Sequence, residues 1–190
     1  MDIILSIPFL IELASAINFN ITLSPLGLKS MYFGNINNLI EEYLNSRDYW
    51  MSKVAPKMNN LGEHAEEFGV NELIEALHLL YDSMGNSLEL QKMIVWQLSE
   101  YHPKLKELAE RRDLLSDSFF KPTDKIFQGT DINLRAIVAL QIAGIYFLTL
   151  HGQNNKAPFC EIQVDTEDGK SQIKKAIETI MSLVYEKVTK

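Results

Sequence analysis

Hydrophobic positions recur every three to four residues along most of this chain, which is the period of an amphipathic α-helix. In the clearest example Leu73, Leu77, Leu80 and Met84 fall on one stripe. No segment shows the regular alternation that indicates a strand. We therefore expect an all-α helical bundle, with helices over 2–18, 25–33, 35–56, 71–84, 88–98, 104–119, 134–150 and from about 166 to the C-terminal end.

Polar residues that favour helix N-termini stand at several of these boundaries. Ser87 follows a Gly-Asn pair and precedes an apolar run, and either Asp131 or Asn133 precedes the run that begins at Leu134. These signals separate the predicted helices and indicate loops over 121–130 and 152–158.

The last two predicted helices have more apolar surface than one subunit of this size commonly hides. Residues 134–150 are apolar on nearly every side, which predicts burial on all faces. In the final helix four apolar residues recur with spacings of four, three and four, as in a packing seam. Pairing two copies into a four-helix bundle would cover this surface; alternatively, both helices close the core of one subunit. The predicted dimer interface comprises Ile137, Leu140, Gly144, Phe147, Ile173, Ile177, Ile180 and Val184.

Composition is typical of a globular protein and unfavourable for broad nucleic-acid binding. The chain has 190 residues, of which 46% are hydrophobic, enough to bury a sizeable core. Its net charge is −7, whereas nucleic-acid binding depends on neutralising phosphates. Within residues 1–50, two basic side chains, Lys29 and Arg47, stand against five acidic ones.

Secretion and membrane insertion are both disfavoured by the sequence. Residues 1–17 are apolar, but Asp2 and Glu12 do not fit a signal peptide. The apolar run 132–150 is interrupted by polar residues, so a buried helix is preferred to a membrane span. The single Cys160 permits no internal disulfide, which fits a reducing cytoplasm.

Enzymatic motifs are missing from the sequence. The four histidines form neither an HExxH motif nor an i, i+4 metal pair, and Glu75 with His78 matches the Glu-x-x-His pattern only once. Glycine-rich phosphate loops and the Gly-x-Ser-x-Gly turn are also missing. We therefore predict no catalytic residues, no metal and no cofactor.

Several stretches resemble the TetR family of bacterial transcriptional repressors. Residues 93–112, which include His102-Pro103, resemble the middle helices of that family's effector domain, 134–151 its dimer-forming helix, and 170–185 its last helix. Residues 31–44, with Tyr32-Phe33 followed by a polar turn, are similar to the junction between the DNA-reading helix and the linking helix. Ile36, however, stands where the family usually has a lysine that contacts phosphate.

The resemblance implies a cytoplasmic, homodimeric regulator that responds to a small hydrophobic ligand. Residues 1–45 would form a divergent or shortened helix-turn-helix head, and 46–190 the effector-binding and dimerisation domain. The expected DNA-binding residues are Lys29, Ser30 and Tyr32. The expected ligand-binding residues, drawn from a group of soft and aromatic side chains that could equally be plain core, are Tyr81, Met84, Met93, Trp96 and Phe119. The alternative is a sensing or protein-interaction dimer that has lost DNA binding.

Overall fold

The computed structural model describes residues 36–47 and 69–189, and every structural statement below refers to that part of the chain. The predicted all-α class is confirmed: apart from a single bridge between Phe159 and Ile162, the described residues form helices and turns. The predicted helices over 2–18 and 25–33 lie outside the described residues. The helices are α3 (Ile36–Arg47), α5 (Val70–Asn86), α6 (Leu88–Ser99), α7 (Pro103–Phe127), α8 (Leu134–Asn155) and α9 (Glu167–Thr189).

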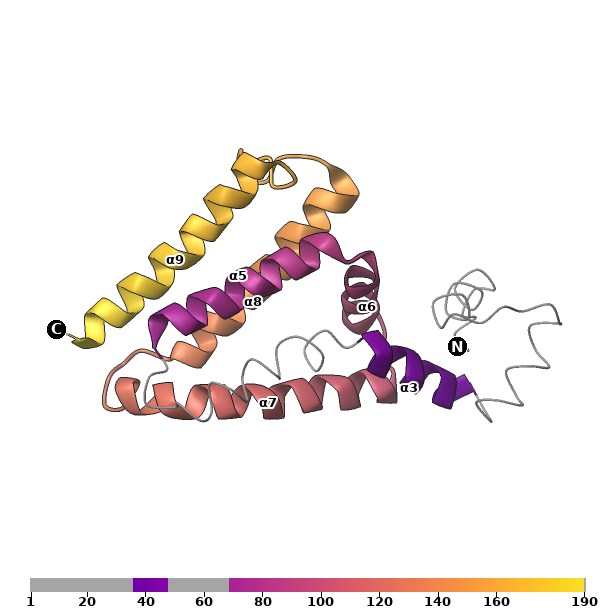
Figure 1. Cartoon of the computed structure of the whole chain (residues 1–190), viewed down its shortest axis with the longest axis horizontal. Coiled ribbons are helices and arrows are strands. Elements are labelled where there is room, and N and C mark those ends of the chain that lie inside the picture. Colours follow the sequence, from indigo (N-terminus) through magenta and orange to yellow (C-terminus); the bar gives the residue numbers. More distant parts are fainter. Residues whose placement is uncertain (1–35, 48–68, 190) are drawn as a thin grey trace.

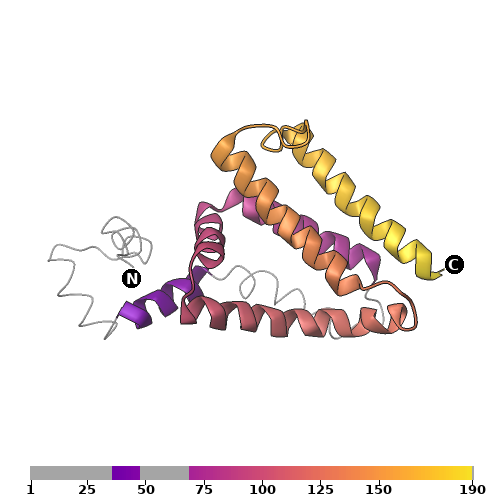
Figure 2. The same cartoon turned by 180° about the vertical axis from the view of Figure 1, so that it is seen from behind.

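Helix α5 is the centre of the packing, because it lies against both α8 and α9. Figures 1 and 2 show α5, α6 and α7 as three sides of a triangle, with α3 beside the start of α7. Polar contacts add to the α5–α9 contact: the Lys174 ammonium lies 2.7 Å from the Asp82 carboxylate, and His78 Nε2 lies 3.2 Å from the Lys174 carbonyl oxygen.

The hydrophobic core is continuous from α3 to α9. The stripe predicted on α5 is buried as expected, and α9 adds Met181 and Tyr185 from the far end of the chain. The most deeply buried side chains are Ile40, Leu44, Leu73, Leu80, Met84, Met93, Leu105, Leu108, Ile145 and Met181.

The predicted capping residues hold the helix starts. Ser87 Oγ accepts a hydrogen bond from Leu90 N at 3.2 Å, and Asn133 Oδ1 accepts one from Ala136 N at 3.0 Å. Each bond satisfies a backbone donor that has no partner inside the helix. Of the two candidates for the start of α8, the structure selects Asn133.

Helix α7 is longer than predicted, and the loop expected over 121–130 begins only after Phe127. Pro122 lies inside this helix, although an internal proline generally costs about 3 kcal/mol. Two contacts favour the helical conformation beyond it. The Thr123 hydroxyl donates to the Phe120 carbonyl oxygen at 2.8 Å, and the buried Phe127 ring meets Tyr185 edge-on at 5.1 Å between centroids.

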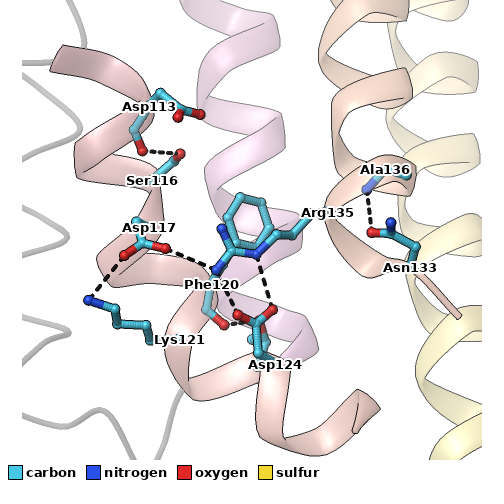
Figure 3. Close-up of polar contacts among 10 residues, drawn as sticks. Asp113, Ser116, Asp117, Phe120, Lys121, Asp124, Asn133, Arg135 and Ala136 are labelled. Atoms are coloured by element: carbon cyan, nitrogen blue, oxygen red, sulfur yellow. Dashed lines mark hydrogen bonds and ion pairs between the residues drawn. The ribbon is translucent and has the colours of Figure 1, made fainter. Parts of the chain in front are cut away.

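Arg135 at the start of α8 joins the two sides of Pro122 (Figure 3). Its guanidinium donates to both oxygens of Asp124, at 3.2 and 2.6 Å, and to Asp117 at 3.0 Å. The guanidinium carbon also lies 5.0 Å from the centre of the Phe120 ring. We call this group of residues the Arg135 clamp; it holds the second half of α7 against α8.

The turn between α8 and α9 is built around two glycines. Gly152 lies inside α8, which runs to Asn155 rather than to the predicted 150, and a Cβ there would lie 2.8 Å from a Val164 methyl group. A Cβ at Gly169 would collide with the Gln163 carbonyl oxygen. The loop predicted over 152–158 therefore begins only at Lys156, and the connection to α9 packs closely on both helices through residues 163–165.

We expect Leu80→Ala to lower the free energy of unfolding by about 2–5 kcal/mol, because it leaves a cavity where α5 meets the rest of the core. Urea unfolding at one fixed protein concentration measures this. The exposed Leu88 provides the matched control, and Leu88→Ala should cost less than about 0.5 kcal/mol. Equal losses in the two variants would contradict the packing described here.

Hydrogen bonds from Lys121 and Arg135 lower the pKa of the Asp117 carboxyl. Because the pKa of Asp117 is lower in the folded chain than in the unfolded chain, its ionised carboxylate stabilises the fold at pH values above the unfolded pKa, near 4. This stabilisation is lost as the pH falls through the folded-state pKa. In Arg135→Gln the pKa of Asp117 should rise part of the way to about 3.9, and in the Lys121→Gln/Arg135→Gln double variant it should rise further. Carboxyl NMR titration reports the value directly. An unchanged pKa in both variants would show that the clamp does not form.

Candidate interaction surface

Helix α8 has two apolar faces on opposite sides. One face is buried, mainly against α5, and consists of Leu134, Val138, Gln141, Ile145, Thr149 and Gly152. The opposite face is exposed along the helix, and the side chains of Leu140 and Phe147 are 75% and 50% exposed. The prediction that α8 is buried on all faces is therefore wrong for the described part of the chain. The helix is apolar on nearly every side, as its sequence indicated, but a single neighbouring layer covers only one side of a helix.

Helix α9 also carries exposed apolar side chains, Ile180 and Leu183. Gln141 Nε2 on α8 lies 2.8 Å from Met181 Sδ on α9, which is a direct contact between the two helices. The two helices run in opposite directions (Figure 2). We call Leu140, Ala143, Phe147, Ile180 and Leu183, all exposed, the α8–α9 face.

The residues predicted for a dimer interface are divided between this face and the interior. Leu140, Phe147 and Ile180 are exposed on it, whereas Ile177 is buried in the chain's own core. The remaining four are half-buried: Ile137, Gly144, Ile173 and Val184. Leu183 was missed because the predicted seam followed Ile177. Its position three residues after Ile180 and seven after Ala176 was the signal that could have identified it.

A groove opens at the edge of the α8–α9 face, between α8 and the end of α6. It has a volume of about 370 Å³ and is lined by Leu98, Ala143, Tyr146, Phe147, Leu150, His151, Asn154 and Asn155. Leu98, the only lining residue from α6, is 71% exposed. We call this feature the α6–α8 groove; none of its lining side chains is an acid, a lysine or an arginine.

An aromatic cluster of Phe147, His151 and Phe159 lies at one end of the groove. The Phe147 ring stacks on His151 with centroids 5.7 Å apart and meets Phe159 edge-on at 5.0 Å. His151 Nε2 lies 3.1 Å from the Ala157 carbonyl oxygen, and its Nδ1 lies 3.0 Å from the Asn155 amide nitrogen. With Nε2 donating and Nδ1 accepting, both ring nitrogens of a neutral imidazole are satisfied. The loop after α8 is thus fastened to the helix that forms the groove.

The residues predicted to bind a ligand do not enclose a large cavity. Met84 and Met93 are fully buried core residues, and Trp96 packs against the core from its edge. Tyr81 lines a hollow of about 50 Å³ beside Asp82, well below the 300–1,000 Å³ typical of ligand pockets. Burial and the nearby Asp82 carboxylate raise the pKa of the Tyr81 hydroxyl. The side chain of Phe119 lies outside the described residues.

The other predicted sites are outside the described structure or are not tested by it. Lys29, Ser30 and Tyr32, predicted to contact DNA, lie outside the described residues. Within the described ranges, no group of three or more His, Cys, Asp or Glu side chains is arranged to hold a metal ion. The Arg135 clamp was not predicted from the sequence, although Asp117 and Asp124 stand seven residues apart and so share one helix face.

The chain matches no protein-family model, no curated protein and no solved structure. Among the described helices, α8 is long and apolar enough to cross a membrane by length and composition alone. That is weak evidence for a span, because the core helix of a soluble protein passes the same test. The function must therefore be inferred from the arrangement of the residues themselves.

Proposed function

We propose that this chain is a homodimeric, ligand-responsive transcriptional regulator of the TetR type. The observation that supports this most directly is the α8–α9 face, an exposed apolar surface on the two helices that the family resemblance assigns to dimerisation. Its large side chains, Leu140, Phe147, Ile180 and Leu183, are roughly half to three-quarters exposed. Contiguous apolar patches on soluble proteins commonly mark interaction sites.

An isologous contact suits this surface. Between Arg135 and Lys156 the α8 sequence contains no charged residue, although the whole chain has a net charge of −7. Two copies meeting through this neutral, apolar strip would avoid most of their mutual repulsion while burying the same residues on each side.

Helix α3 would link the body to a DNA-binding head in the residues that precede it. Its Glu41 carboxylate lies 2.9 Å from the Lys104 ammonium of α7, and Asn45 Oδ1 accepts a hydrogen bond from Arg111 at 2.8 Å. Ile40 and Leu44 are buried in the body's core. A small hydrophobic effector in the body would move the head by shifting α3, provided that it binds one position of this helix better than another.

The excess of acidic side chains in residues 1–50 supports a second candidate function, a sensing dimer that does not bind DNA. Residues 1–50 contain two basic and five acidic side chains, which leaves few donors for phosphate contacts. The dimer is common to both candidates, and only contact with DNA separates them.

We expect Leu140→Glu to raise the dimer dissociation constant about 30-fold or more, because it places a charge at the centre of the apolar α8–α9 face. Analytical ultracentrifugation over a dilution series measures the constant, with a monomer mass of 21.7 kDa. Leu114→Glu on α7, where the leucine is also 75% exposed, is the matched control. A wild-type chain that stays monomeric through the micromolar range would refute the dimer.

DNA binding is tested with the full-length chain, a duplex covering the neighbouring promoter and a scrambled duplex of equal length. The regulator hypothesis predicts a promoter-specific shift at low salt that weakens as salt rises. A dimer that shifts neither duplex, even at low salt, would favour the sensing dimer instead. A shift lost on adding a candidate apolar effector would support the ligand response.

A further inference from the structure

We propose that the α6–α8 groove belongs to the same dimer contact, so that a second copy of this chain covers the end of α6 together with α8 and α9. This inference rests on the dimer of the proposed function and extends its interface to a third helix. The groove and the α8–α9 face are continuous, because Ala143 and Phe147 belong to both.

The area required for a stable dimer favours this larger contact. A standard interface covers about 800 Å² on each partner. If each exposed large apolar side chain offers about 150 Å², the lower end of the aromatic range, the four on the α8–α9 face supply roughly 340 Å² at their observed exposures. The groove adds Leu98 together with the accessible parts of Tyr146 and Leu150 on the same side of α8. A partner that covers both regions comes much closer to the area of a stable interface.

The lack of charge in the groove favours a second copy over a charged partner. The groove is lined by apolar, aromatic and amide side chains and by His151, and none of its lining residues is Asp, Glu, Lys or Arg. A basic or acidic partner would therefore meet no complementary charge there. The uncharged strip of α8 that borders the groove is present on every copy of the chain, so two copies present matching apolar surfaces to each other.

The side chains of one groove wall are already held in place in the single chain. His151 fastens the loop after α8 through the Ala157 carbonyl oxygen, and Phe147 is held between His151 and Phe159. Side chains that are already fixed lose little conformational freedom when a partner covers them. Leu98 projects from the end of α6 at the opposite wall and provides the exposed apolar contact.

Leu98→Glu should therefore weaken the dimer about ten-fold or more, whereas Leu114→Glu should leave its dissociation constant unchanged. Leu98→Met, which keeps the apolar contact, should behave like the wild type. Analytical ultracentrifugation gives the constants, and circular dichroism with thermal unfolding confirms that each variant folds. Because Leu98 is largely exposed in the single chain, its replacement should not disturb the subunit.

A second measurement locates the contact without adding a charge. In a Cys160→Ser background, which removes the only native thiol, Leu98→Cys should react more slowly with a thiol reagent as protein concentration passes the dissociation constant. Leu114→Cys should react at the same rate throughout.

The outcomes separate the two proposals. If the wild type is dimeric and Leu140→Glu dissociates it, but Leu98→Glu and the thiol at position 98 behave as their controls do, the groove lies outside the contact and this inference fails alone. A monomeric wild type overturns the groove contact and the dimer together. A weakened Leu98→Glu dimer with protection at position 98 supports both.

Discussion

The structure depends on how α8 divides its apolar surface. Leu134, Val138, Ile145 and the other residues of its inner face pack mainly against α5, and burial of such surface stabilises a fold by roughly 25 cal/mol per Å². On the outer face, Leu140 and Phe147 are 75% and 50% exposed in the described structure. One helix thus serves the core on one side and leaves apolar side chains exposed on the other.

The elements around α8 give this surface its shape. α9 contacts it where Gln141 Nε2 meets Met181 Sδ. The Arg135 clamp fixes its start against α7, and His151 fastens the loop at its other end. Since α7 also contacts α3 through Lys104, the surface is connected by packed helices to the segment that would lead to a DNA-binding head. That connection gives the proposed regulator a physical route for coupling.

The sequence predicted the individual helices and their caps better than it predicted which helices pack against one another. The stripe containing Leu80 and the caps Ser87 and Asn133 are determined within one or two helical turns, so the sequence was sufficient for them. Beyond Pro122, α7 is bonded through Asp124 to Arg135, which lies after the following loop and so outside the local pattern of the helix. Periodicity also could not show that Ile177 faces the core, because that depends on where the other helices pack.

The closeness of backbone to backbone at Gly169 has a consequence for engineering the chain. Any side chain there would meet the Gln163 carbonyl oxygen, and a side chain at Gly152 would meet Val164, so residues 163–165 leave no room between the connection and the two helices. An affinity tag or reporter domain inserted between Gln163 and Gly169 would disturb this packing. Cys160 and Glu161, which are exposed in the same connection, are better positions for an insertion.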